Sequence, residues 1–304
     1  MRNELSRMID AAAANGRRTA VLIAGPTASG KSGLAHALAR AVDGVVINTD
    51  ALQVYDTLRV VTARPSADEI QDVPYRLYGF VDCAEAFSTG KWLANARQVI
   101  AESDRKILFF VGGTGLYFDA LINGFADIPQ VAATVRAEVR SRIAGLDAEQ
   151  RLALLQVEDP EAALRLKVVD PQRLERALSV KAATGRMLSS FQQQPETGAL
   201  VGIETVRVVL DPDREVLRQR IANRFEEMFT NGAVDEVRNL LERKLDPSLP
   251  AMKAIGVPEI SAWLHGDIIQ ETAIERAVIA TRQYAKRQRT WFRNRFSDWV
   301  RLPS

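Results

Sequence analysis

The chain has 304 residues, of which 47% are hydrophobic and 26% are charged. This is the composition of an ordinary globular protein, and the length suits two domains or one domain with an insertion. Because 40 Lys and Arg residues nearly balance 38 Asp and Glu residues, a nucleic-acid surface would have to come from local clustering of charge. The single cysteine excludes a disulfide framework and a cysteine-rich zinc site, and no apolar run approaches the length of a membrane span. We therefore expect a cytoplasmic protein without a membrane partner.

The first chemical signal is a glycine-rich loop. It lies between an apolar run, residues 20–24, and a segment, 33–42, in which apolar residues recur at helical spacing. The loop residues are Gly25, Pro26, Thr27, Ala28, Ser29, Gly30, Lys31 and Ser32. Strand, loop and helix form the context in which the pattern G-x-x-x-x-G-K-[ST] binds phosphates, because the loop N–H groups and the helix N-terminus are both partly positive. We therefore expect a phosphate chain here, with Lys31 adding a charge and the Ser32 hydroxyl binding Mg²⁺.

Further apolar segments at 45–48 and 107–111 predict two more strands, and residues 92–101 between them predict a helix. Strands that alternate with helices favour an α/β fold, here a P-loop core with a parallel sheet flanked by helices. The P-loop, Asp50 and residues 112–115 each follow the end of one of these strands. Ligands of such sheets bind outside the carboxyl ends of the strands, so we expect the three polar patches to meet in one cleft.

Residues 121–200 have a different character. Strand signals disappear, charged segments rich in Ala and Leu take over, and Asp159-Pro160 and Asp170-Pro171 are typical helix starts. A strand at 203–210 then returns. We predict an all-helical insertion domain, 121–200, within a core made of 1–120 and 201–304, the latter ending in basic helices.

The last predicted helix carries a strong local charge. Residues 276–301 hold eight basic side chains and one acid, Asp298. Four of the basic residues are spaced by four, three and four positions, which places them on one helix face: Arg282, Lys286, Arg289 and Arg293. Ala277, Ala280, Tyr284 and Trp291 fall on the opposite face. We expect this helix to pack by its aromatic side and to present the basic face to a phosphate backbone.

These patterns leave the chemistry open. A P-loop suits an ATPase, a GTPase or a kinase, but a hydrolytic NTPase normally has an apolar strand that ends in Asp. Strand 107–111 ends instead in Gly-Gly-Thr-Gly, so Asp50 is the acid nearest the loop, either as a metal-shell residue or as a base near the acceptor. The G-x-G-x-x-G fingerprint is absent, and His36 and His265 form no cluster.

Several segments occur in the order seen in the tRNA dimethylallyltransferase family, which the chain resembles over nearly its whole length. They are 25–32, Asp50 with Gln53-Val54-Tyr55, 111–117 (VGGTGLY), 170–178 (DPQRLERAL), 220–228 with Glu236-Val237, and 281–293 (TRQYAKRQRTWFR). The resemblance implies transfer of a dimethylallyl group from dimethylallyl diphosphate to N6 of the adenosine at position 37 of tRNA, next to the anticodon. It also implies that Mg²⁺ assists and that the insertion binds tRNA. We expect the protein to act as a monomer.

The resemblance assigns roles to single residues. It implies that the P-loop and Arg224 bind the diphosphate, that Asp50 accepts a proton from the adenine amine, and that Thr114 lies near the acceptor. General chemistry agrees, because an allylic diphosphate leaves when its charge is neutralised, and an exocyclic amine attacks better when a carboxylate takes its proton. The expected catalytic set is Asp50, Thr114, Lys31 and Arg224.

The resemblance also implies a tRNA surface formed by many residues. They are Asp50, Ala51, Leu52, Gln53, Thr114, Arg136, Gln172, Arg173, Leu174, Glu175, Arg176, Lys253, Gly256, Arg282, Lys286, Arg287, Gln288, Arg289 and Arg293. The chain departs from the family pattern at Ala51, where Ser is usual, at Arg64, where Lys is usual, and at Val257-Pro258, where Tyr is usual. These departures bear on RNA preference, while Lys31 and Asp50 are unaffected.

Two other functional classes compete with this one. A P-loop kinase of a small metabolite or nucleotide would explain the loop and Asp50, but neither the basic helix nor the Gly-Gly-Thr-Gly strand end. A non-catalytic RNA-binding module is disfavoured by the intact Gly30-Lys31-Ser32. Relatives that prenylate adenosine phosphates would need neither the insertion nor the basic face.

Overall fold

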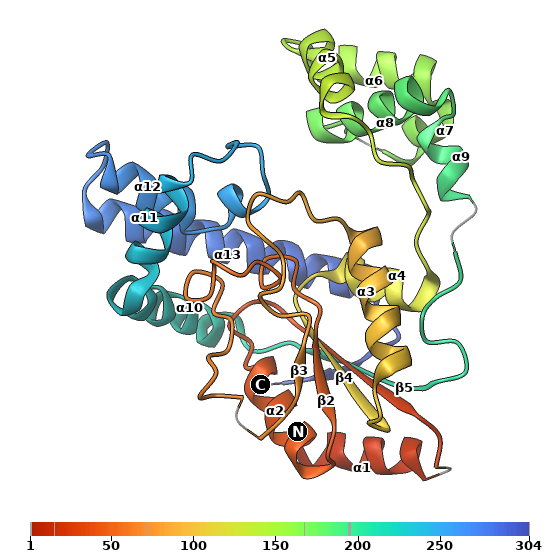
Figure 1. The fold of residues 1–304 in the computed structure, drawn as a ribbon, viewed down its shortest axis with the longest axis vertical. Coiled ribbons are helices and arrows are strands. Elements are labelled where there is room, and N and C mark those ends of the chain that lie inside the picture. The colour runs from red at the N-terminus through yellow and green to blue at the C-terminus, as the bar shows by residue number, and fades with distance from the viewer. Residues whose placement is uncertain (1, 15, 71, 167, 194–195, 304) are drawn as a thin grey trace. The chain divides into compact units, whose positions relative to one another are not determined.

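The computed structural model describes residues 2–14, 16–70, 72–166, 168–193 and 196–303. It divides into two compact units, one made of Met1–Ile122 with Ala199–Ser304 and the other of Asn123–Gly198 (Figure 1). The expected insertion limits, 121 and 200, lie two residues outside the limits of the second unit. Among the residues described, no helix has the length and apolar character needed to cross a membrane.

The first unit is built on a parallel six-stranded sheet with the spatial order β3-β2-β4-β1-β5-β6. Ala24 at the end of β1 is in register with Gly112 of β4, and Asn48 at the end of β2 is in register with Val111. The carboxyl ends of these three strands therefore lie level, and the P-loop, Asp50 and the Gly-Gly-Thr-Gly turn emerge side by side. The strands are β1 (Thr19–Ala24), β2 (Val45–Asn48), β3 (Tyr75–Arg76), β4 (Ile107–Gly112), β5 (Glu204–Leu210) and β6 (Val300–Leu302).

Helices α1 (Arg2–Ala13) and α2 (Lys31–Ala41) cover one face of the sheet, where Leu5 and Leu38 join Val21 and Phe109 in a buried core. Since β1, β2 and β4 are buried along nearly their whole length, they read in the sequence as continuous apolar runs instead of alternating ones.

Helices α3 (Thr89–Glu102) and α4 (Gly115–Asn123) lie on the other side of the sheet (Figure 1). Trp92 of α3 stacks on Tyr117 of α4 with 4.3 Å between ring centroids. Its indole N–H donates to the Asn48 carbonyl at 2.9 Å. The stacked pair thus fixes the end of β2, two residues before Asp50.

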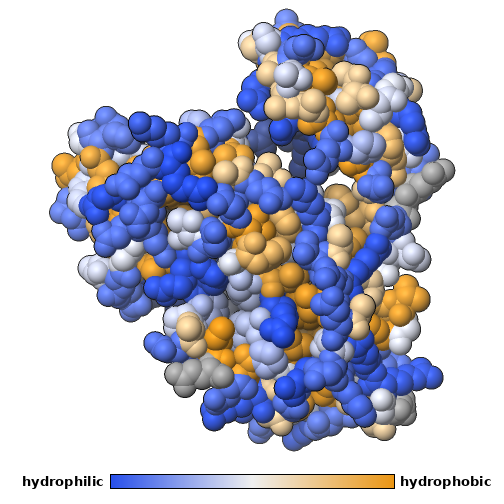
Figure 2. All heavy atoms as spheres, in the orientation of Figure 1, coloured by the Kyte–Doolittle hydropathy of each residue, from blue (hydrophilic) through white to orange (hydrophobic). Residues whose placement is uncertain are grey.

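A group of helices follows β5 and precedes β6. Figure 2 shows that hydrophilic residues cover most of the visible surface around α10 and α11, as expected for helices that bury only one face. The elements are α10 (Arg214–Met228), a π-helical turn (Phe229–Ala233), α11 (Val234–Glu242), a 3₁₀ turn (Ala251–Lys253), α12 (Val257–Leu264) and α13 (Gln270–Arg295).

Helix α13 packs differently from the expectation. Its buried face runs through Ala277, Thr281, Ala285, Gln288 and Phe292, whereas the aromatic residues expected to pack, Tyr284 and Trp291, are only half-buried. The reason is that α13 packs between the carboxyl end of the sheet and α10. The face that it buries there is rotated about the helix axis relative to the predicted aromatic face. Arg289, which borders the buried stripe, pairs with Asp211 at 2.8 Å instead of projecting into solvent.

Among the described residues of the second unit, the regular elements are all helices, as the sequence predicts for this region. Its core gathers Leu155, Leu174 and Leu178. Asp159 is buried, accepts hydrogen bonds from the backbone N–H groups of Ala162 and Ser189, and so joins the start of α7 to α9. The helices are α5 (Ala133–Ile143), α6 (Ala148–Glu158), α7 (Pro160–Arg165), α8 (Pro171–Thr184) and α9 (Leu188–Gln192).

Candidate active site

The P-loop connects β1 to α2 through a sharply turned backbone. Gly30 has φ +83° and Ala28 has φ 62°, two left-handed conformations that turn the loop around a concavity. A side chain at Gly25 would crowd the Leu210 carbonyl at 3.1 Å and the Ser29 hydroxyl at 2.9 Å, so glycine eases the passage of the loop beside β5. The predicted phosphate-binding loop is therefore formed at the carboxyl end of β1.

Two helices from the end of the first unit hold Thr27 of this loop. Arg224 of α10 donates to the Thr27 hydroxyl at 2.5 Å, and the Thr27 N–H donates to the side-chain oxygen of Gln288 at 2.9 Å. Arg220 lies one helical turn before Arg224, with its guanidinium 4.0 Å from the position a Cβ on Gly30 would take. The loop is thus flanked by two arginines, of which the sequence had indicated one.

Lys31 is the cation supplied by the P-loop itself. Its ammonium group donates to the Pro26 carbonyl at 3.1 Å. Burial lowers its pKa to about 8, although the negative charge of Asp50 opposes the shift, and the charge of Arg224 adds to it. Burial also lowers the pKa of Arg224, again opposed by Asp50. Two partly desolvated cations and one carboxylate therefore share the site, which favours binding of an added anion.

Asp50 is held at the end of β2 by a network of short hydrogen bonds. Its N–H donates to the Asn48 side chain at 2.8 Å, and one of its carboxylate oxygens accepts from the Leu52 N–H at 3.0 Å. The Asn48 amide in turn donates to the Asp50 carbonyl at 2.9 Å. One carboxylate oxygen is thus occupied by the backbone, and the other is available to accept a proton.

Thr114 lies on the neighbouring strand end. Its hydroxyl accepts from the Ala51 N–H at 2.9 Å, and its own N–H donates to the Thr49 carbonyl at 3.1 Å. The turn can approach this closely because a side chain at Gly112 would overlap the Thr49 carbonyl at 2.2 Å. The structure therefore brings Asp50 and Thr114 together, as the sequence predicts for residues that follow adjacent strands.

Tyr284 joins this group, although the sequence pattern had suggested only a packing role for it. Burial, followed by the negative charge of Asp50, raises the pKa of its hydroxyl, and the nearby side chain of Thr114 opposes this shift. Helix α13, which carries the predicted basic face, thus contributes a side chain beside Asp50 and Thr114. No sequence signal separated Tyr284 from the other aromatic residues of this helix.

A small cavity opens between the P-loop, Asp50 and α10. Its polar end is formed by Thr27, Asp50 and Arg224. The remaining wall is mainly apolar and comes from Leu52, Val61, Thr62, Ile221, Phe225, Met228, Ala254, Ile255, Thr281 and Tyr284. Such a cavity suits a ligand with a phosphate at one end and a short hydrocarbon at the other.

The cavity wall around Val61 is held by one carboxylate. Glu236 of α11 accepts from three successive backbone N–H groups, those of Arg59 at 3.1 Å, Val60 at 2.7 Å and Val61 at 3.0 Å. These N–H groups have no strand to pair with, so Glu236 replaces the partners that a sheet would provide. The family-like Glu236-Val237 dipeptide thereby acquires a structural explanation.

Replacing Glu236 by Ala is expected to lower the free energy of unfolding by about 1–3 kcal/mol, because it leaves these backbone donors unpaired. Urea denaturation monitored by circular dichroism measures the loss. Glu242→Ala is the matched control, because Glu242 is exposed at the end of the same helix. An equal effect of both substitutions would remove the special role of Glu236.

Some of the predicted RNA-contacting residues of the first unit are exposed, and others are buried or hydrogen-bonded within the protein. Arg282, Lys286, Arg287, Arg293 and Lys253 are exposed, whereas Gln288 is only 5% exposed and Gly256 is buried. Gln53 donates to the Thr62 and Ala63 carbonyls at 2.9 and 3.2 Å, which makes it part of the loop that carries Val61. The exposed cations of α13 and Lys253 remain suited to a phosphate backbone.

In the second unit, the predicted residues lie at the start of α8 and on α5. Arg136, Gln172, Arg173 and Arg176 are exposed, and Leu174 is buried in the helical core. Arg173 pairs with Asp170 at 3.1 Å, and Glu175 pairs with Arg140 at 3.1 Å. Although Arg176 is exposed, desolvation by the atoms packed around its guanidinium, followed by the neighbouring charge of Arg136, lowers its pKa. Arg136 and Arg176 therefore form a site of like charge that an anion would stabilise.

All three departures from the family pattern have a clear structural setting. Ala51 contributes its N–H to Thr114, an interaction that needs no side chain. Arg64 donates to the Asp56 carbonyl at 2.6 Å, and its guanidinium covers Gly79 so closely that a side chain there would overlap it. Val257 and Pro258 begin α12, where proline is tolerated in the first turn.

The described residues contain no cluster of three or more His, Cys, Asp and Glu side chains that could cage a metal ion. Mg²⁺ is usually held by few protein ligands together with substrate phosphates and waters. Ser32, in the first turn of α2, supplies the hard oxygen that such an ion accepts. The donor set therefore fits an Mg²⁺ ion that arrives with a diphosphate.

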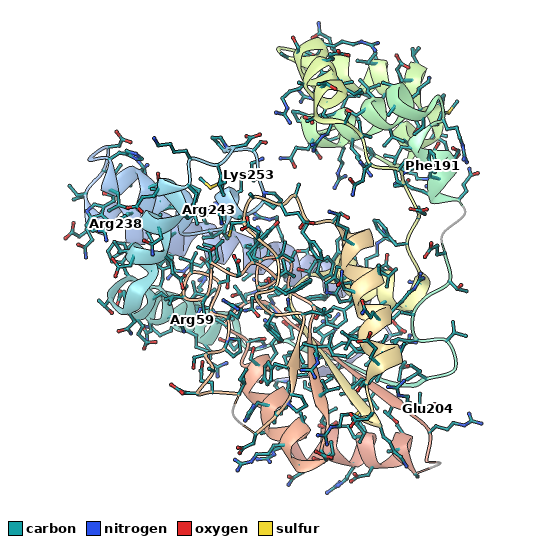
Figure 3. All side chains as sticks on the ribbon, viewed as in Figure 1. Arg59, Phe191, Glu204, Arg238, Arg243 and Lys253 are labelled. Carbon is teal, nitrogen blue, oxygen red and sulfur yellow. The ribbon has the colours of Figure 1, made fainter. Side chains whose placement is uncertain are left out.

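The side chains drawn in Figure 3 include Arg59, Arg243 and Lys253 on the segments that border this site. Arg243 pairs with Asp82 at 2.7 Å, which ties the end of α11 to the loop before α3. Arg238 stands at the outer edge of the same helix and pairs with Asp235 at 2.6 Å. These two pairs belong to the framework around the site and not to its lining.

Known proteins match this chain along most of its length. The family model described as IPP transferase matches residues 53–295, and that of isopentenyl transferase matches residues 18–83. A tRNA dimethylallyltransferase of Methylobacterium radiotolerans is 50% identical over 289 residues, covering 94% of this chain and 94% of the relative. One from Rhizobium johnstonii is 48% identical over 286 residues, covering 93% and 96%.

Solved structures agree with this match. The full-length tRNA isopentenylpyrophosphate transferase of Bacillus halodurans superposes with a TM-score of 0.66 at 31% identity, covering 94% of this chain and 90% of that one. A eukaryotic dimethylallyltransferase, crystallised acting on tRNA, gives a TM-score of 0.77 at 27% identity, covering 94% and 74%.

The parallel sheet, the P-loop at its switch in strand order and the carboxylate beside it define a P-loop enzyme of the group-transferring kind. The chain belongs to the tRNA dimethylallyltransferase family, also called the IPP transferase family.

Proposed function

We propose that the protein transfers a dimethylallyl group from dimethylallyl diphosphate to N6 of the adenosine next to the anticodon of tRNA. One observation carries the proposal: a cavity whose polar end is formed by Arg224, Asp50 and Thr27 of the phosphate loop, and whose remaining wall is mainly apolar. Lys31 of the same loop adds a second positive charge close to Asp50 and Arg224. The membership of the family, whose relatives are named for this reaction, supports the same donor and acceptor.

The residues divide the reaction between them. The P-loop N–H groups, Lys31 and Arg224 neutralise the diphosphate, so that the bond between its oxygen and C1 of the allyl group breaks with both electrons on oxygen. N6 of adenine forms the new bond to C1 and loses a proton, which Asp50 accepts through its free carboxylate oxygen. The apolar wall excludes water, which would otherwise capture the allylic carbon.

Mg²⁺, bound to the diphosphate and to the Ser32 hydroxyl, would add positive charge to the leaving group. The protein's own contribution at this point is the single hydroxyl ligand and the concave backbone around it. The diphosphate product then leaves from the same loop.

A macromolecular acceptor accounts for the basic residues far from the cavity. The exposed cations of α13 and the Arg136–Arg176 pair are suited to RNA phosphates, and an anticodon-loop base is accessible to extrusion. An acceptor of this kind implies a location in the cytoplasm, where tRNA is modified. A kinase of a small metabolite would have no use for these surfaces, so the kinase alternative is not favoured.

The direct test uses the purified protein with Mg²⁺, labelled dimethylallyl diphosphate and unmodified tRNA, with labelled ATP in a parallel reaction. Label in the tRNA, lost when the adenosine beside the anticodon is replaced, is the expected result. Transfer of phosphate from ATP without prenylation would contradict the proposal and favour a P-loop kinase.

The salt dependence of tRNA binding provides a separate prediction for α13. Arg282→Ala is expected to weaken tRNA binding and to lower the slope of log K against log salt by about 0.7–0.9, because one phosphate contact is lost. Arg238→Ala is the control, since Arg238 lies on α11 and pairs with Asp235. Equal slopes for wild type and Arg282→Ala would mean that this face of α13 is merely solvated.

A further inference from the structure

Gln288 is a buried polar residue for which the reaction described above has no use. It lies on α13 between the exposed Arg287 and the ion-paired Arg289, yet its own side chain is only 5% exposed. Its amide oxygen accepts from the Thr27 N–H at 2.9 Å, and its amide N–H₂ donates to the Gly113 carbonyl at 2.9 Å. A resemblance-based expectation placed Gln288 among the RNA contacts, but its burial leaves RNA no direct access to the amide.

The two bonded partners belong to opposite halves of the site. Thr27 is part of the diphosphate loop, and its hydroxyl accepts from Arg224. Gly113 directly precedes Thr114, which is bonded to Ala51 beside Asp50. The side-chain amide of Gln288 thus links the diphosphate loop to the turn beside Asp50 through these two hydrogen bonds. We call this link the strap.

The surroundings are shaped for this amide. A side chain at Gly113 would come within 2.1 Å of the Gln288 nitrogen, so glycine leaves the space the amide occupies. Thr281, Ala285 and Phe292 bury the same face of α13, which fixes the helix from which the amide projects. Only a group with one acceptor and one donor at this length can satisfy both backbone partners.

We infer that Gln288 is a positioning residue that sets the register between the diphosphate loop and the acceptor-side turn. This inference rests on the proposed prenyl transfer. In that reaction C1 of the donor and N6 of the acceptor must meet at bonding distance, and misplacement by about 1 Å costs on the order of 10²-fold in rate. The strap therefore acts on kcat, while the surfaces that bind tRNA are unchanged.

The first test is Gln288→Leu, which preserves the volume of the side chain and removes both hydrogen bonds. We expect kcat to fall on the order of 10²-fold, with the Kd for tRNA unchanged. A kcat within threefold of wild type, or a raised Kd for tRNA at unchanged kcat, would overturn the inference. The second of these outcomes would return Gln288 to the RNA-contacting residues.

The second test, Gln288→Glu, gives a readout that a purely structural role would not produce. A protonated Glu keeps one acceptor and one donor, whereas an ionised Glu has acceptors only and turns one of them towards the Gly113 carbonyl. The ratio of variant to wild-type kcat should therefore rise as the pH is lowered from 8 to 6, because burial raises the pKa of a carboxyl group. Tyr284, Lys31 and Asp50 are present in both proteins, so the ratio removes their contribution.

Gln270→Glu is the matched control, because Gln270 begins the same helix and is exposed. It is expected to keep the wild-type rate and a ratio that does not vary with pH. A flat ratio for Gln288→Glu would contradict the strap even if Gln288→Leu fails to fold. Prenyl transfer by the wild type is measured in the same series, so failure of the proposed function is seen separately as absence of any product.

Discussion

Replacing Asp50 by Asn is expected to lower kcat by about 10³-fold, within the range that general-base catalysis contributes. The reason is that Asn keeps the hydrogen bond to the Leu52 N–H but cannot take the proton from the attacking amine. The Kd for tRNA, measured by filter binding, should stay within about twofold, since the change removes no RNA-facing cation. Single-turnover prenylation with saturating tRNA and donor isolates the chemical step.

Asp235→Asn is the control for Asp50→Asn. Asp235 is exposed on α11 and pairs with Arg238. Its replacement should leave both kcat and the Kd for tRNA near the wild-type values. Parallel losses of tRNA affinity and rate in Asp50→Asn would assign Asp50 to acceptor binding instead of proton transfer.

Donor binding is expected to weaken as the pH rises above about 8, the pKa to which burial lowers Lys31. A bound diphosphate stabilises the ammonium form and raises that pKa, so binding above this pH must take up a proton. Below pH 8 the lysine is already charged, and affinity should be constant. Above it, affinity should fall by up to about tenfold per pH unit until the pKa of the complex is reached.

Calorimetric titration with dimethylallyl diphosphate in buffers of different ionisation enthalpy measures this proton uptake directly. Lys31→Arg should abolish the pH dependence, because a guanidinium stays charged over the whole range. Lys31→Met should lower kcat by about 10²–10³-fold, as expected when one group that stabilises the leaving charge is lost. An affinity that is flat from pH 7 to 10 in the wild type would contradict the assignment of Lys31 to the diphosphate.

The sequence was sufficient for those parts of the site that are local in the chain. The P-loop, Asp50 and Thr114 each follow a buried apolar run, and runs of that length in an α/β pattern are strands of a parallel sheet. The strand ends then had to converge, which the register of β1, β2 and β4 confirms. The helical character of 121–200 was equally local, since it depended on helix-start signals and composition.

Two strands were not predicted, and two site residues were predicted with other roles, Tyr284 as a packing residue and Gln288 as an RNA contact. β3 and β6 have two and three residues, too short for any periodicity to appear, and they form because longer strands offer a free edge. Tyr284 and Gln288 lie on a helix whose buried stripe is decided by what it packs against, namely the P-loop and α10. Neither the spacing of apolar residues nor the charge pattern contains that information, so the basic face of α13 was predicted and its inward face was not.

The chain leaves the first unit after Ile122 and returns at Ala199, and these crossing points are adjacent, because the Ala199 N–H donates to the Leu121 carbonyl at 2.8 Å. The whole helical unit is therefore an insertion, here called the guest, whose two connections to the host unit lie next to each other. The entropic cost of closing such a loop grows only slowly with its length. This arrangement frees the two parts to diverge at different rates: the guest can be lengthened, shortened or exchanged by recombination at residues 122 and 199, while the host keeps its donor chemistry.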